Sequence, residues 1–169
     1  MTDELHSQNK FYVPILDAGL AQREQTHNEY SQYKDGKSND VFIKDYNGQY
    51  ITGRVWPNDA VFPDFFKNET KDWWMEELTQ MWKNVGFDGL WLDMNEISNF
   101  CDGICYDEQE AESPIMYQLP YIPTGRNIQS KSLSLDAIHN GTIKELNAHS
   151  LFGTMEVQAT HEWFESIQK

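Results

Sequence analysis

Basic residues are scarce in this chain of 169 residues, which contains 13 Lys and Arg against 27 Asp and Glu. The formal net charge is −14, and an acidic surface repels phosphate groups, so we expect no nucleic-acid partner. Long apolar runs are also absent. No stretch approaches the ~18 consecutive apolar residues of a membrane helix, and residues 1–10 contain no apolar signal-peptide core. Six Trp and 39% apolar residues nevertheless predict a folded domain.

Metal-binding patterns are missing as well. The two cysteines, Cys101 and Cys105, have a spacing that is not typical of zinc ligands, and no second Cys/His pair lies near them. The five His are scattered and form no H-E-x-x-H pattern. We therefore expect no metal site. For the two cysteines the sequence leaves two states open, a local disulfide and a pair of free thiols.

Two short apolar runs each end in an acid. One covers 11–17 and ends at Asp17, and the other covers 87–93 and ends at Asp93. Continuous apolar character is typical of strands that are buried on both faces, as in a parallel sheet. A helix predicted between the two runs completes the pattern of a βαβ unit. The two acids are therefore expected at the carboxyl edge of one parallel sheet.

The segment between the first run and this helix reads as irregular. Residues 21–40 contain no Val, Ile, Leu or Phe, which predicts a polar loop. A small hairpin is predicted over 41–55, turning at Asn47-Gly48. We expect Trp56-Pro57 to end it, because the residue before a proline is restricted in conformation.

Two helices are predicted from apolar residues at spacings of three and four. The first covers about 68–84, begins at an Asn68 or Thr70 cap and stops at Gly86. The second covers 150–167, with Ser150 as its N-cap. The apolar stripes expected on the two helices consist of Trp74, Leu78, Met81 and Val85, and of Leu151, Met155, Ala159 and Trp163.

The segment with the clearest chemical content is 89–96, G-L-W-L-D-M-N-E. The alternation of side chains along a strand puts Trp91 and Asp93 on the same side. An indole beside a carboxylate offers an apolar face and a polar group, a combination suited to holding a sugar ring. Acids at the carboxyl ends of parallel strands also lie where barrels and open α/β sheets bind their ligands.

This segment is similar to the nucleophile signature of glycoside hydrolase family 31, and the α-glucosidase branch looks closest. Further segments match the family in the same order along the chain. V-P-I-L-D-A over 13–18 resembles the end of the third barrel strand, and G-R-V-W-P over 53–57 with V-F-P-D over 61–64 resembles a family loop. H-S-L-F-G over 149–153 resembles the start of the next helix.

The resemblance implies an α/β fold, a partial (β/α)8 TIM barrel with about two barrel strands and their loops and helices. It would occupy residues 11–169 after a polar lead-in over 1–10, with long excursions at about 20–68 and 97–148. By the same match Asp93 is the catalytic nucleophile and Glu96 a supporting acid. The residues implied to line the glucose subsite are Ile15, Asp17, Trp56, Trp91 and Met94.

The implied activity is retaining hydrolysis of terminal α-linked glucose from oligosaccharides, without a cofactor. The family's acid/base carboxylate follows the helix at which this chain stops, so the 169 residues are expected to be a piece of a longer protein and inactive alone. The alternative function is a catalytically inactive carbohydrate-binding remnant. The resemblance favours a lysosomal, vacuolar or secreted location.

Overall fold

The computed structural model of the protein describes residues 2–23, 28–105, 121 and 128–167. Helices and short strands alternate irregularly along them, and the long connection after residue 105 lies largely outside the described part. The elements are α1 (Thr2–Ser7), β1 (Ile15–Asp17), β2 (Leu20–Ala21), α2 (Ser31–Ser38), β3 (Gly53–Val55), β4 (Asn58–Val61), α3 (Asn68–Val85), β5 (Trp91–Asp93), β6 (Ile138–His139), β7 (Ile143–Lys144), α4 (Glu145–Ala148), the 3-10 turn η3 (His149–Leu151) and α5 (Phe152–Ile167).

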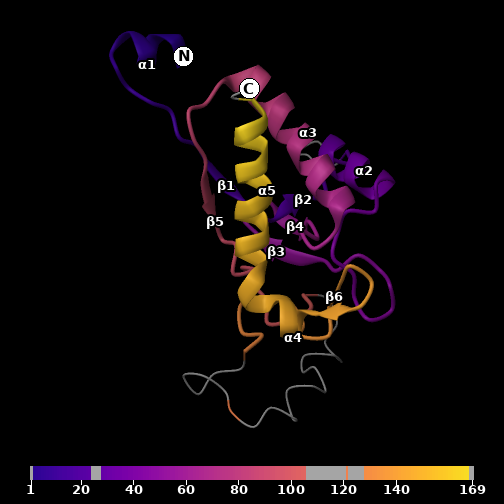
Figure 1. The fold of residues 1–169 in the computed structure, drawn as a ribbon. Helices are drawn as coiled ribbons and strands as arrows, with labels where there is room; N and C mark the ends of the chain where they lie inside the picture. The colour runs from indigo at the N-terminus through magenta and orange to yellow at the C-terminus, as the bar shows by residue number, and fades with distance from the viewer. Residues whose placement is uncertain (1, 24–27, 106–120, 122–127, 168–169) are drawn as a thin grey trace.

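The strands β1 and β5 form a two-stranded parallel sheet, which confirms the predicted pairing of the two apolar runs. Their register aligns Asp17 with Asp93, so the two acids lie side by side at the carboxyl edge. Pro14 precedes β1 and is compatible with the sheet because it only accepts, from the Trp91 N–H at 2.9 Å. In Figure 1, β1 and β5 lie to the left of α5, and α3 lies to its right.

A second sheet, antiparallel and ordered β2-β4-β3, fills the connection between β1 and α3. Its strands β3 and β4 form a hairpin whose turn is Trp56-Pro57, since Val55 pairs with Asn58. The expectation that Trp56-Pro57 ends a hairpin was therefore wrong. Proline lacks a donor but fits a turn, where no ladder hydrogen bond is needed. The predicted turn at Asn47-Gly48 does form, closed by a bridge between Lys44 and Tyr50.

The expectation of a polar loop over 21–40 was also wrong in part, because α2 covers Ser31–Ser38. The sequence of this helix is mostly polar, so we attribute its position to packing against the rest of the protein. Its Gly36 lies directly against the Phe42 ring, with no room for a side chain between them. Phe42 is completely buried and also contacts Tyr33 of α2, with ring centroids 5.7 Å apart and the ring planes tilted by 31°.

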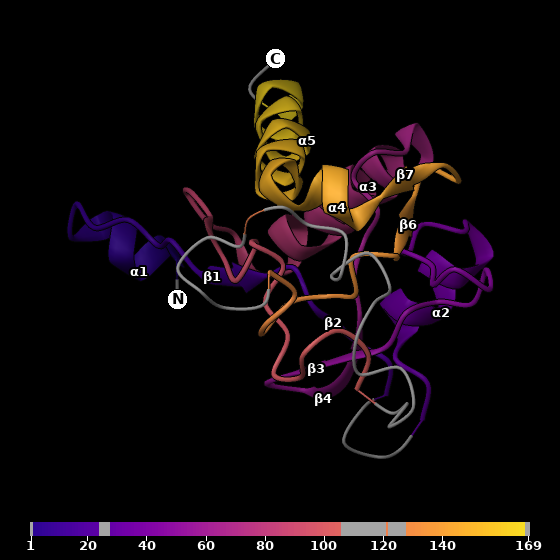
Figure 2. The ribbon, with the colours of Figure 1, turned by 90° about the horizontal axis from the view of Figure 1, so that it is seen from below.

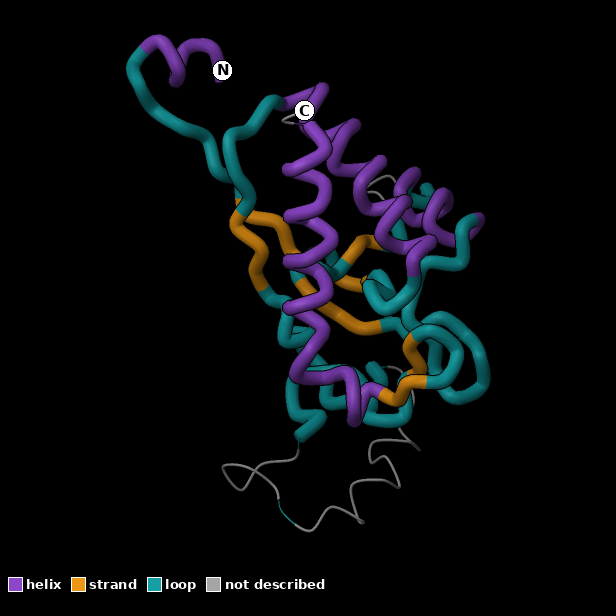
Figure 3. The backbone as a smooth tube through the Cα atoms, in the orientation of Figure 1, coloured by secondary structure: helices purple, strands orange, loops and turns teal. Residues whose placement is uncertain are grey.

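The long helices α3 and α5 pack against each other near their C-terminal ends and diverge toward their N-terminal ends (Figures 1 and 3). Two indole–threonine hydrogen bonds cross this contact in opposite directions. Trp74 Nε1 donates to Thr160 Oγ1 at 3.0 Å, and Trp163 Nε1 donates to Thr79 Oγ1 at 2.9 Å. These two indole N–H groups are thereby satisfied, which reduces the cost of placing Trp74 and Trp163 in the core.

The helix ends differ from the predicted ones. Asn68 is the first residue of α3 and no side chain caps that helix, while Thr70 donates instead to the Val41 carbonyl at 3.2 Å. Gly86 does end α3, with a φ of 64° that suits glycine. Ser150 lies inside η3, a turn that leads from α4 into α5, so it does not begin a helix. The predicted stripes are buried at their centres, whereas Val85 and Leu151 are exposed.

The hydrophobic core is formed by residues of the two long helices, the second sheet and the segments between them, and Figure 2 shows these elements from below. Its largest fully buried members are Trp163, Phe42, Phe62, Phe65 and Phe152.

Cys101 and Cys105 form a disulfide, which decides between the two states that the sequence left open. Among the described residues, no helix is long and apolar enough to cross a membrane.

The lead-in over 1–10 contains the short helix α1, which stands apart from the rest in Figure 1. It is attached at the end of α3. Thr2 Oγ1 donates to the Val85 carbonyl at 2.8 Å, and His6 Nε2 lies 2.9 Å from Asp88 Oδ1. The division of the chain into a lead-in and a catalytic part remains a prediction.

Candidate active site

The paired acids at the carboxyl edge of β1 and β5 form the centre of the site. Both side chains are partly buried. Asp93 Oδ1 accepts a hydrogen bond from its neighbour's N–H, that of Met94, at 2.9 Å. Burial raises the pKa of Asp17, and the negative charge of Asp93 raises it further. The Asp93 carboxylate is therefore close enough to influence the protonation of Asp17.

Two apolar side chains precede these acids on the same strands. Ile15 pairs with Trp91 in the parallel register, two residues before each acid. Within the described chain both are exposed, Ile15 by 52% and Trp91 by 58%. An exposed Trp on a strand is available for contact with a ligand or with further protein.

Trp56 reaches the same site from the β3–β4 turn. Its Nε1 lies 3.1 Å from the sulfur of Met94, and its ring meets Phe100 edge-on at 5.1 Å. Otherwise the ring is 73% exposed. The structure thus brings the predicted site residues Trp56 and Met94 together although 38 positions separate them in the sequence.

The loop after β5 departs from regular backbone geometry. Met94 has a positive φ of 57°, and the peptide bond between Glu96 and Ile97 is cis. Glu96, the predicted supporting acid, is exposed and accepts a hydrogen bond from Ser98 Oγ at 2.7 Å. A positive φ is uncommon for a residue with a side chain and occurs often at functional sites.

Asn99 fixes the far end of this loop, and it was not among the predicted site residues. It is buried, and its Oδ1 accepts from the Arg54 N–H at 2.9 Å. Its amide nitrogen donates to the Gly103 carbonyl at 3.0 Å. Asn99 therefore ties the loop after β5 to β3, the strand that leads to Trp56. The only sequence signal was its place in the segment 95–100, N-E-I-S-N-F.

A buried charged cluster lies elsewhere in the molecule and was also missed. His139 Nδ1 lies 3.3 Å from Asp64 Oδ1, and its Nε2 lies 2.6 Å from Glu145 Oε2. All three side chains are completely or almost completely buried. Burial lowers the pKa of His139, but the hydrogen bonds to Asp64 and Glu145 outweigh it and raise the pKa to about 9. The histidine is therefore charged at neutral pH.

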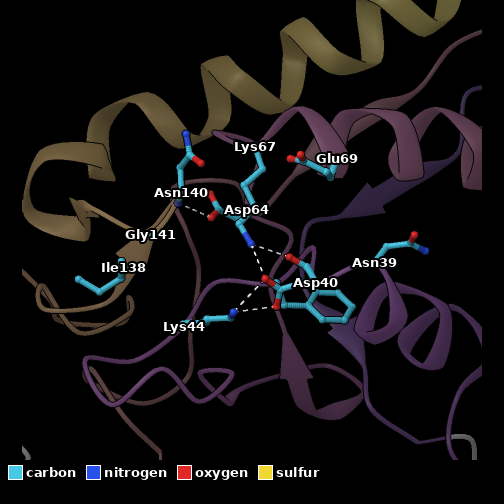
Figure 4. A pocket seen from close by; sticks show the side chains of 10 residues that line it. Asn39, Asp40, Lys44, Asp64, Lys67, Glu69, Ile138, Asn140 and Gly141 are labelled. Carbon is cyan, nitrogen blue, oxygen red and sulfur yellow. Dashed lines mark hydrogen bonds and ion pairs between the residues drawn. The ribbon is translucent and has the colours of Figure 1, made fainter.

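A cavity of about 470 Å³ lies above Asp64, on the face shown in Figure 4. Both lysines in its wall are paired with the same acid. Lys44 and Lys67 both pair with Asp40, at 2.8 and 3.1 Å, and these contacts lower the pKa of Asp40 to about 2 against the effect of burial. The predicted sugar-binding residues do not line this cavity.

In the described part of the chain no three His, Cys, Asp or Glu side chains gather in a way that would hold a metal ion.

Fold and site together define a class: a parallel α/β unit that carries a carboxylate pair at its carboxyl edge, as in barrel enzymes. The family model for the TIM-barrel domain of glycosyl hydrolases family 31 matches residues 1–169. The chain therefore belongs to glycoside hydrolase family 31 and forms part of its TIM barrel, as the resemblance implied. The described strands do not close a barrel.

Individual relatives agree with this assignment. The chain is 36% identical to an alpha-glucosidase of Hordeum vulgare over 158 residues, and 35% identical to the lysosomal alpha-glucosidase of Rattus norvegicus over 165 residues. These matches cover 94% and 95% of the chain but only 17% and 16% of the relatives. A solved glucosidase II alpha subunit, bound to Glc1Man2, superposes with a TM-score of 0.71 at 21% identity, over 96% of this chain and 14% of that one.

Proposed function

We propose that this chain is the nucleophile-bearing part of a retaining α-glucosidase, which hydrolyses terminal α-linked glucose from oligosaccharides. The observation that carries the proposal is the register of β1 and β5, which sets Asp17 beside Asp93 at the edge where barrel enzymes bind their substrates. The similarity to plant and mammalian alpha-glucosidases supports the choice of substrate. The same relatives support a lysosomal, vacuolar or secreted location.

In this mechanism the Asp93 carboxylate attacks the anomeric carbon and forms a covalent glycosyl-enzyme. Asp17 binds the sugar beside it, while Trp56, Trp91, Ile15 and Met94 provide the apolar wall of the subsite. A second carboxylic acid must protonate the leaving oxygen and later activate water, at roughly 5–5.5 Å from the nucleophile in retaining enzymes. We assign that acid to a part of the barrel beyond this chain.

The proposal is tested in a protein that carries this segment within a complete barrel. Asp93→Asn should abolish turnover of maltose and leave maltose binding measurable. The amide is nearly isosteric, so the packing around Met94 survives, while the charge and the attacking oxygen are lost. Asp72→Asn, on the exposed side of α3, is the matched control and should not change turnover.

Turnover that survives Asp93→Asn would contradict the assignment of the nucleophile. A parent protein that binds maltose without hydrolysing it would instead favour the carbohydrate-binding remnant. The 169-residue chain alone should not release glucose above the level of its own Asp93→Asn variant. It lacks the proposed acid, and proton transfer to the leaving group is typically worth ~10²–10⁴-fold in rate.

A further inference from the structure

Glu156 is a buried carboxyl group whose presence the folding of α5 does not explain. Its side chain is fully buried, and neither carboxyl oxygen makes a hydrogen bond of normal geometry. A buried polar group without a partner is unfavourable, and more so if it is charged. The other polar side chains on the buried face of the same helix differ in this respect, since Thr160 accepts from Trp74 at 3.0 Å.

The surroundings of Glu156 connect it with the candidate active site. One turn earlier on α5, Gly153 packs against Asn95 so closely that an added Cβ would lie 3.0 Å from the Asn95 carbonyl oxygen. Asn95 follows Asp93 by two positions, in the loop that begins with the positive φ of Met94. The Asn95 side chain also lies close enough to Glu156 to influence its charge. The face of α5 formed by Gly153 and Glu156 therefore supports the nucleophile loop, residues 93–96, from below.

We propose that Glu156 is a positioning residue for the nucleophile loop: from its buried place on α5 it holds the loop, through the Asn95 side chain, in the geometry that Asp93 needs. The inference rests on the proposed function of Asp93 as nucleophile. Glu156 does not touch the substrate in this account and acts only through Asn95.

The charges around Glu156 favour the protonated form. The pKa of Glu156 is raised to about 7: burial is the main cause, the Asp17 carboxylate on β1 adds to it, and the amide of Asn95 acts in the opposite direction. An ionised Glu156 would add a second negative charge on the side of Asp17 and would pull the Asn95 amide toward itself. Loss of the proton is therefore expected to disturb the loop and to weaken catalysis.

Two uncharged variants of similar volume, Glu156→Gln and Glu156→Met, separate hydrogen bonding from packing. Both are made in the complete-barrel protein and compared by kcat and KM for maltose at pH 5. Glu156→Gln keeps an uncharged polar group beside Asn95 and should keep kcat within about twofold. Glu156→Met cannot, and a misplaced nucleophile should lower kcat by ~10–100-fold while KM changes less. A melting curve of each variant shows that it is folded.

The pH profile supplies a readout that a purely structural role would not change. As pH rises through about 7, the parent protein should lose kcat as Glu156 ionises, whereas Glu156→Gln should keep it to higher pH. Superimposable profiles of the parent and Glu156→Gln would overturn the inference. So would a Glu156→Met variant with the parent's kcat, or a Glu156→Gln variant as impaired as Glu156→Met.

An infrared measurement keeps this inference separate from the proposed function. At pH 5 the spectrum of the parent protein minus that of Glu156→Gln should contain the carbonyl band of a protonated carboxylic acid, and that band should disappear above pH 8. A parent protein that shows no turnover would contradict the proposed function, but the infrared band would still report whether Glu156 is protonated. Absence of the band at pH 5 would show that Glu156 is ionised and would overturn the inference.

Discussion

Two groups of carboxylates in this molecule are held in different ways. At the β1–β5 edge, Asp17 and Asp93 lie beside each other, partly exposed, and burial together with the neighbouring charge raises the pKa of Asp17. Around His139, the carboxylates of Asp64 and Glu145 are buried completely and bond to a cationic ring between them. The first two acids have charges of the same sign and are accessible to a ligand. The second two are neutralised by the cationic ring of His139 and are shielded from ligands by their burial.

The two groups of acids have surroundings suited to different roles, one to stability and the other to function. A buried acid with a cationic partner and satisfied hydrogen bonds has no capacity left for a substrate. Asp64 also accepts from the Asn140 N–H at 2.6 Å, and Glu145 also contacts His149 at 2.9 Å. Acids at the strand edge keep free oxygen atoms and a neighbour of the same sign, which is typical of catalytic carboxylates. We therefore assign stability to the cluster around His139 and chemistry to the edge.

The largest effect is expected from His139→Ala. Removal of the cation leaves Asp64 and Glu145 buried without compensation, which costs about 3–5 kcal/mol of unfolding free energy. Chemical denaturation of the complete-barrel protein measures this cost. His161→Ala is the matched control, because His161 is 71% exposed and its pair with Glu165 lies on the surface. It should change stability by less than about 0.5 kcal/mol. Equal effects of the two substitutions would contradict the stabilising role of the cluster.

The cluster should also make stability depend on pH in one direction. The pKa of His139 is about 9 in the folded protein, above its unfolded value, so its contribution is fully present below about pH 6.5. It is lost as pH rises through about 9. The stability difference between the parent and His139→Gln should shrink by about 3 kcal/mol between pH 6.5 and 10. A stability difference between the parent and His139→Gln that grows over this pH range would contradict the positive charge assigned to His139.

A smaller effect, on catalysis only, is expected from Asp17→Asn. Loss of a charged hydrogen bond to the substrate, worth about 1.5–3 kcal/mol, should lower kcat/KM by about 10- to 150-fold, mainly through KM. The melting temperature should stay close to that of the parent, because the partly exposed Asp17 has no cationic partner to lose. A strong loss of stability without a change in KM would place Asp17 with the structural acids and remove the contrast between the two groups.

The pairing of β1 with β5, and of the acids at their ends, could be predicted from the sequence because its signals are local. Each of the strands β1 and β5 is an apolar run that ends in Asp, and the helix before the second strand suggested parallel pairing. The motif around Asp93 then supplied the family. The Trp56-Pro57 turn was misplaced because the restriction before proline marks an irregular position without telling a turn from a strand end.

The cluster around His139 was missed because its signals are not local. Asp64 and His139 are 75 positions apart, and a lone His in a polar segment does not reveal that it will be buried between two acids. Likewise, α2 is held by the contact of Gly36 with Phe42, which its own sequence does not indicate. Glu156 occupies the buried face of α5, where residue spacing alone predicts an apolar side chain.

The central claim is that Asp93 is the residue that bonds to the sugar. A mechanism-based cyclitol inhibitor traps the glycosidase nucleophile as a covalent ester, and mass spectrometry of the digested complete-barrel protein locates it. The account predicts one label, on Asp93, that is absent from Asp93→Asn and retained in His139→Ala variants that still fold. A label on Asp17 or Glu96, or an unchanged label in Asp93→Asn, would contradict it.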